Sequence, residues 1–155
     1  MPSFDIFNHL LAPIMAGLEA DVRFEGIKIF YDRRDDEIVS SNEMPAINYF
    51  LAPDWEDIAR GSNSASLNDR KLTVNLGFGV WAFDTSKSRL DRALFQIMGN
   101  LIDWLRENTD FDRVNGVALS GSLRWTPVEA FGDENNLVGC QKIVASFELY
   151  AGAGV

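Results

Sequence analysis

The motif that comes closest to known chemistry is a pair of glycines in the stretch "LTVNLGFGVWAFD", residues 72–84. Its letters GFGVWA match a dinucleotide-binding fingerprint, in which a strand ends at the glycines and a helix opens at once, so that free backbone N–H groups meet the phosphates. Here Gly77 and Gly79 fall inside a run of period two, and the next helix starts only near Ser86 or Ser88. We therefore interpret the glycines as marks of a bulge or a close backbone approach within one strand.

No other set of side chains has the spacing of a catalytic or metal site. The single His9 and the single Cys140 exclude a Cys/His zinc site and an internal disulfide, and the lone cysteine suits a reducing compartment. The acids at 35–37 and 54–57 lack the spacing of an oxygen cage, so we interpret them as solvated loop charge. The stretch "DENN" at 133–136 lacks the later residues of a calcium loop. We expect no catalytic residue, no metal and no cofactor, and hence no enzyme.

Composition sets limits on the partners. The chain has 155 residues, 46% of them hydrophobic, and its length favours a single domain over 1–155. Its net charge is −9, and residues 1–57 carry most of it, with 12 acidic and 4 basic side chains. Such a surface repels a phosphate backbone, so tight binding of duplex DNA by a basic face is not expected. Because no apolar run reaches the roughly 18 residues of a membrane span, we expect a soluble protein made in the cytoplasm, without a membrane partner.

Two stretches have the period of helices. From a possible cap at Ser3, apolar residues recur at spacings of 4, 3 and 4, although Pro13 predicts a kink or a broken first turn. The stretch 87–107 repeats at 4, 3, 4 and 3, which predicts a long helix lying flat on a sheet. The apolar positions are Phe7, Leu11, Ile14 and Leu18 in the first helix, and Leu90, Leu94, Ile97, Leu101 and Trp104 in the second.

Short apolar or alternating segments predict the strands. They are 26–31, 45–51, 72–84, 117–125 and 142–150. The last two are expected to form one long hairpin, connected through the turn-rich residues 131–139. The fold class that follows is α+β, with two main helices packed on one face of a largely antiparallel sheet and with long loops.

Two features remain unexplained by a plain globular domain. The loops 31–43 and 53–71 are long for a chain of this size, and loops of that length are often functional. Trp81 and Phe83 lie on the strand face opposite Leu72 to Val80, so large apolar groups flank both sides of the strand end. In a small α+β domain the natural cover for them is another subunit.

The order of these elements resembles one known family. An N-terminal helix precedes "MPAI" at 44–47, and the extended strand "KLTVNLGFGVWAFD" precedes the helix "RALFQIMGNLIDWLREN". A closing hairpin then ends in "ASFELY". This layout, over roughly residues 3–150, is similar to the tail terminator (tail completion) proteins of long-tailed bacteriophages. The loop at 53–71 is longer than that family needs.

The resemblance implies a structural protein of the virion. It implies a homohexameric ring that caps the tail tube, stops its polymerisation and offers its other face to neck or head-completion proteins, while DNA passes through without specific binding. We expect Trp81 and Phe83 at the subunit interface. The loops supply the plausible partner contacts Arg33, Arg34, Trp55 and Arg60. Two alternatives stay open: another neck, head-tail joining or baseplate protein, and a small cytoplasmic enzyme.

Overall fold

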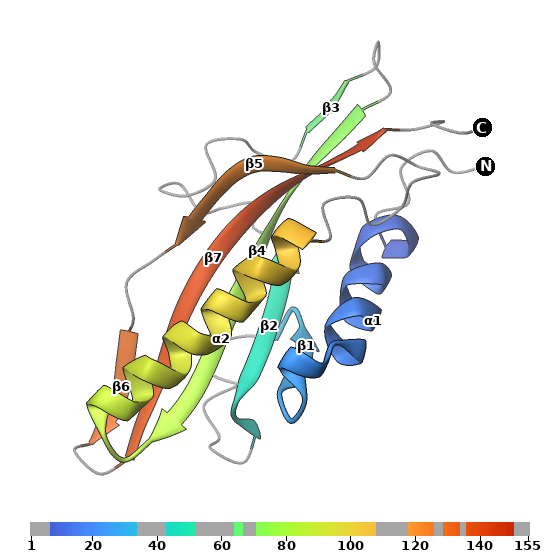
Figure 1. The fold of residues 1–155 in the computed structure, drawn as a ribbon. Helices are drawn as coiled ribbons and strands as arrows, with labels where there is room; N and C mark the ends of the chain where they lie inside the picture. The colour runs from blue at the N-terminus through green and yellow to red at the C-terminus, as the bar shows by residue number, and fades with distance from the viewer. Residues whose placement is uncertain are drawn as a thin grey trace.

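The computed structural model describes residues 7–33, 43–51, 64–66, 71–107, 118–125, 129–133 and 136–150 (Figure 1). They form a mixed but mostly antiparallel sheet with α-helices packed on one face, so the predicted α+β class is confirmed. The elements in chain order are the π-helical turn η1 (Phe7–Leu11), α1 (Ala12–Ala20), the 3-10 turn η2 (Val22–Phe24), β1 (Lys28–Tyr31), β2 (Ala46–Leu51), β3 (Ser64–Ser66), β4 (Lys71–Asp84), α2 (Lys87–Glu107), β5 (Ala118–Trp125), β6 (Glu129–Asp133) and β7 (Asn136–Tyr150).

Strands β4 and β7 form the middle of the sheet. They pair antiparallel along the whole of β4, from Lys71 opposite Tyr150 to Asp84 opposite Leu137. The strand order is β1-β2-β4-β7-β5, with β3 also paired to β4 and β6 to β7. Only β1 and β2 run parallel among the described pairs.

Two predictions about connections were incomplete. The expected pairing of 117–125 with 142–150 is confirmed by β5 and β7, but the segment 131–139 supplies strand β6 and the start of β7 as well as a turn. The segment 53–71, predicted as loop, contains β3. Both short strands pair with ends of the two long strands, and an exposed row of unpaired backbone groups attracts such strands whatever their composition. The other residues of the segment 53–71, up to residue 70, lie outside the described ranges.

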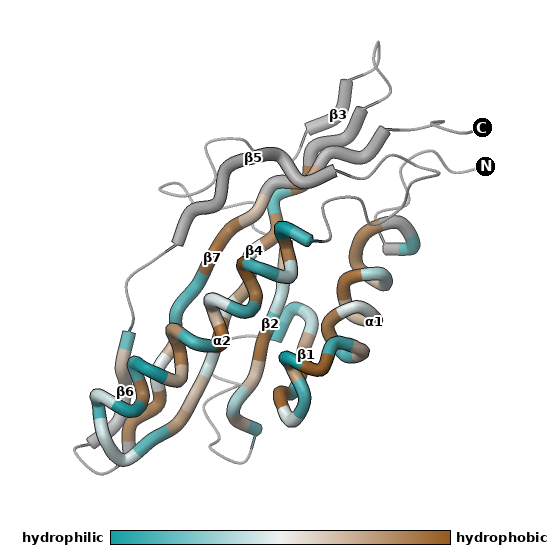
Figure 2. Tube along the Cα trace, viewed as in Figure 1, coloured by the Kyte–Doolittle hydropathy of each residue, from teal (hydrophilic) through white to brown (hydrophobic). Residues whose placement is uncertain are grey.

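The main core lies between the helices and the sheet. Figure 2 shows hydrophobic and hydrophilic residues alternating along α2, as the predicted amphipathic stripe requires. Helix α2 lies over β4 and β7, while α1 lies toward the β1 end of the sheet (Figure 1). The buried residues of α2 are Leu90, Leu94, Met98, Leu101, Trp104 and Leu105, whereas Ile97 is partly buried. They face the buried residues Val74, Leu76, Phe78, Val80 and Ala82 of β4.

The N-terminal helical segment divides as Pro13 predicts. Residues Phe7–Leu11 form a π-helical turn, and α1 begins at Ala12, which places Pro13 in the first turn of the α-helix. Proline has no backbone N–H to donate, and the change from π-helix to α-helix lies next to it. Helix α1 then approaches α2 closely, since a Cβ atom on Gly17 would lie 2.6 Å from Cζ2 of Trp104. Within the described ranges, neither helix has the length and apolar character that a membrane crossing requires.

Candidate interaction surfaces

The sheet face opposite the helices carries a second, smaller apolar cluster. Its position follows from the register, because Ala46, Trp81 and Cys140 are neighbours on β2, β4 and β7. Along each strand these residues alternate with residues of the main core, so they lie on the opposite face of the sheet. Val138 belongs to the same cluster, and Phe30 and Met44 pack against it. We call this side of the sheet the open face.

The two glycines of the GFG stretch lie on the open face and accept aromatic rings. A Cβ atom on Gly77 would lie 2.4 Å from Cζ of Phe50, and one on Gly79 would lie 3.1 Å from Nε1 of Trp81. Strand β4 pairs with β7 without a break at either glycine, so there is no bulge there. The close-approach interpretation is confirmed, and the glycines lie in mid-strand, where they cannot open a phosphate-binding helix.

The two residues predicted at a subunit interface differ in exposure. Trp81 is 2% exposed, because the cluster with Phe30, Met44 and Cys140 covers it. The expectation that Trp81 needs another subunit to cover it was therefore wrong, since its own chain does so. Phe83, two residues along β4, is 37% exposed. Contact of either residue with a neighbouring subunit stays a prediction, and Phe83 is the one accessible in the single chain.

Arg33 is held by its own chain. Its Nη1 donates to Oε2 of Glu43 at 2.9 Å, and its guanidinium carbon lies 3.9 Å from the ring centroid of Phe30. Its backbone N–H donates to Oδ1 of Asn48 at 3.0 Å, and Asn48 Nδ2 donates to its carbonyl at 2.9 Å. Arg33 thus covers Phe30, which in turn covers Trp81. With its side chain 38% exposed, Arg33 remains accessible to a partner, but it also has a structural role that the sequence did not indicate.

The other three predicted partner contacts, Arg34, Trp55 and Arg60, lie outside the described residues. The structure thus places Trp81 and Phe83 on one strand, and it places Arg33 beside the cluster that contains Trp81 through Phe30.

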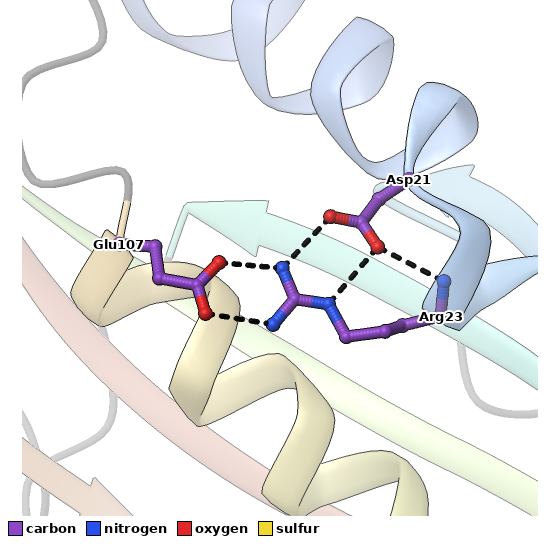
Figure 3. Close-up of polar contacts among 3 residues, drawn as sticks. All are labelled: Asp21, Arg23 and Glu107. Carbon is purple, nitrogen blue, oxygen red and sulfur yellow. Dashed lines mark hydrogen bonds and ion pairs between the residues drawn. The ribbon is translucent and has the colours of Figure 1, made fainter.

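An arginine paired with two carboxylates joins the helical segments (Figure 3). It lies on the face of the sheet against which the helices pack, which we call the covered face. Arg23 in η2 donates to both carboxylate oxygens of Asp21, and also to both oxygens of Glu107 at the end of α2, at 2.7–3.0 Å. Asp21 also caps η2 by accepting the backbone N–H of Arg23. These hydrogen bonds lower the pKa of Asp21 from 3.8 to about 2. Local sequence patterns could not reveal this contact, because Arg23 and Glu107 are 84 residues apart.

A shallow depression lies beside α2, on the covered face. It has a volume of about 260 Å³ and is lined by Phe95, Met98, Gly99, Ile102 and Gln141, the last from β7. Phe95 is 56% exposed. The periodicity of 87–107 did not indicate this site. One signal was present, because Phe95 is a large apolar residue that falls outside the predicted stripe of α2.

Neither the side-chain chemistry of the described residues nor the comparisons with known proteins assigns a function to these surfaces. Across the described ranges, no three His, Cys, Asp or Glu side chains gather in a way that could hold a metal ion. Cys140 is buried at 3% exposure within the small apolar cluster. The comparisons with known proteins name no family for the chain: no protein-family model matches it, and no curated protein sequence matches it significantly.

Proposed function

We propose that the chain is a structural protein of a long-tailed bacteriophage virion, and that it forms a ring, a homohexamer in the resembling family, on the end of the tail tube. The ring stops polymerisation of the tube and offers a docking face to neck or head-completion proteins. This role requires protein surfaces rather than a reacting group.

The arrangement of the two sheet faces is the observation that carries the proposal. Both α-helices of the described chain pack on one face, and the open face ends in Phe83 at 37% exposure. A subunit that must contact neighbours on two sides needs apolar surface beyond its own core. Aromatic side chains supply a large share of interface energy, which favours Phe83 as a contact.

The order and length of the elements add support. A helix precedes a short strand that begins after Met44, and the 14-residue β4 precedes the 21-residue α2. The chain then closes with antiparallel strands that end in the 15-residue β7. This succession agrees with the layout on which the resemblance to tail terminators rests.

The charge of the chain suits a ring through which DNA passes. A net charge of −9 gives a surface that repels phosphates on average. Weak contact with the lumen wall allows DNA to move, whereas a basic wall would retain it. Another neck, head-tail joining or baseplate protein would share these properties and is the second candidate.

Complementation of tails that lack a terminator tests the proposal. The purified chain is added to such tails, and tube length and joining to heads are scored by negative-stain microscopy. We expect tubes of one length that join heads. Tubes that continue to grow in the presence of the folded chain would contradict the proposal, whereas tubes of normal length that do not join heads would favour another neck component.

A further inference from the structure

The outer side of α2 carries an apolar stripe with a basic residue at each end. Arg92, Phe95, Gly99, Ile102 and Arg106 follow one another at spacings of 3, 4, 3 and 4, which places them on one side of the helix. Three of the five line the depression beside β7. Arg92 and Arg106 are exposed, and no ion pair joins either of them to another described residue. We call this feature the α2 groove.

Gly99 is costly within the isolated chain. Glycine inside a helix makes the helix less stable than alanine would, because the backbone of glycine loses more conformational freedom on folding. A Cβ atom at Gly99 would meet nothing within 4 Å, so no contact inside the chain requires glycine there. The missing side chain leaves space beside Phe95 into which an external group can pack.

The size of the α2 groove argues against a small-molecule site. Small-molecule pockets usually enclose roughly 300–1,000 Å³ and bury most of the ligand. The depression has about 260 Å³, and its rim residue Phe95 is 56% exposed. One or two apolar side chains from a protein surface suit this space better.

The open face of the same chain carries a group that fits the groove. Phe83 is 37% exposed and lies opposite Val138 on the neighbouring strand. Glu129 on β6 is also exposed and pairs in register with Cys140, which places its position on the open face. Phe83 together with Glu129 therefore forms an apolar group with an acidic residue nearby, which we call the Phe83 surface.

Charge favours a second copy of the chain as the occupant. Glu129, beside Phe83 on the open face, is an acidic residue with which Arg92 and Arg106 at the ends of the α2 groove can pair when another copy approaches. Complementary charge of this kind sets orientation and excludes approaches that bring like charges together.

We infer that the α2 groove of one copy receives the Phe83 surface of a second copy, on the opposite face of the next sheet. The inference rests on the proposed ring and specifies its contact. Because the two surfaces are different and lie on opposite faces of one chain, the contact is head-to-tail. Such contacts generate a closed ring when the rotation between subunits closes.

Mixing two face variants tests this geometry. Phe83→Asp disrupts the Phe83 surface, and Phe95→Asp disrupts the α2 groove. Val22→Asp is a matched control, since Val22 is 78% exposed and belongs to neither surface. We expect each face variant to weaken self-association by about 30-fold or more, as loss of a central anchor does. An equimolar mixture of the two should form 1:1 dimers by mass photometry, because one intact contact remains. The control should assemble like the wild type, and circular dichroism checks the fold of all three.

Other outcomes would overturn the inference. Dimers of either face variant alone would show that a surface pairs with itself, and a mixture that stays monomeric would show that the two surfaces do not meet. Assembly of both variants at the wild-type level, or a wild type that stays monomeric, would exclude the contact. If the wild type caps tail tubes while the mixture stays monomeric, only this inference fails. If the mixture dimerises but tubes are not capped, only the proposed function fails.

Discussion

On the covered face of the sheet, Trp104 is enclosed between α1 and the core, with Gly17 against its ring and Phe24 edge-on at 6.5 Å. On the open face, Trp81 is equally buried, but residues before β2 cover it instead of a helix. Two positions further along β4, that cover has ended and Phe83 is exposed. The comparison teaches that helices enclose the tryptophan on one face, whereas on the other face the cover ends at Phe83, in the surface that we assign to a neighbour.

Replacing one tryptophan on each face tests how completely the chain closes them. Trp104→Ala and Trp81→Ala should each destabilise the monomer by about 3–5 kcal/mol, because both side chains are 2% exposed and their removal leaves a cavity. Urea denaturation at low protein concentration measures both. A cost below about 1 kcal/mol for Trp81→Ala alone would show that the monomer does not rely on its cover.

Replacing a glycine in each helix compares a closely packed position with an open one. Gly17→Ala should destabilise the chain by about 1–3 kcal/mol, since the new methyl group overlaps the ring of Trp104. Gly99→Ala should stabilise the monomer by about 0.5–1 kcal/mol, because alanine is the better helix former and the space is open. Thermal denaturation compares the two variants. Equal effects of the same sign would remove the distinction between these surfaces.

Arg33 tests the cover of the open face. Arg33→Ala removes an ion pair with Glu43 and a contact with the ring of Phe30, and should cost about 1 kcal/mol in total. Lys28→Ala is the control, since Lys28 is exposed on β1 and should change stability by less than about 0.5 kcal/mol. If chemical denaturation gives both variants wild-type stability, Arg33 does not stabilise the cover of the open face.

The smallest expected effect concerns the ion pair on the covered face. The folded pKa of Asp21 is about 2, below the ordinary 3.8, so its hydrogen bonds with Arg23 stabilise the chain above about pH 4 and lose their effect as pH falls toward 2. The wild type should therefore be more stable than Arg23→Gln at pH 5, with the difference shrinking between pH 4 and 2. Solvent screening at these partly exposed groups keeps the effect modest. A difference that is constant over this range would exclude the linkage.

Local periodicity predicted the parts of the fold that depend on it. The alternation in 72–84 gave β4, and the stripe from Leu90 to Trp104 gave α2, because each pattern reports which side of an element is buried. The strands β3 and β6 were missed, since pairing with β4 and β7 decides them. The cover of Trp81 and the partner of Arg23 depend on residues far away in the chain, which no local pattern encodes.

The mass of the wild-type protein in solution tests the central claim most directly. Native mass spectrometry over a series of concentrations measures which oligomers form. A head-to-tail contact that closes predicts monomers and one discrete larger species, a hexamer in the ring that we propose. A protein that stays monomeric throughout, or an open series of sizes without a dominant member, would contradict the account.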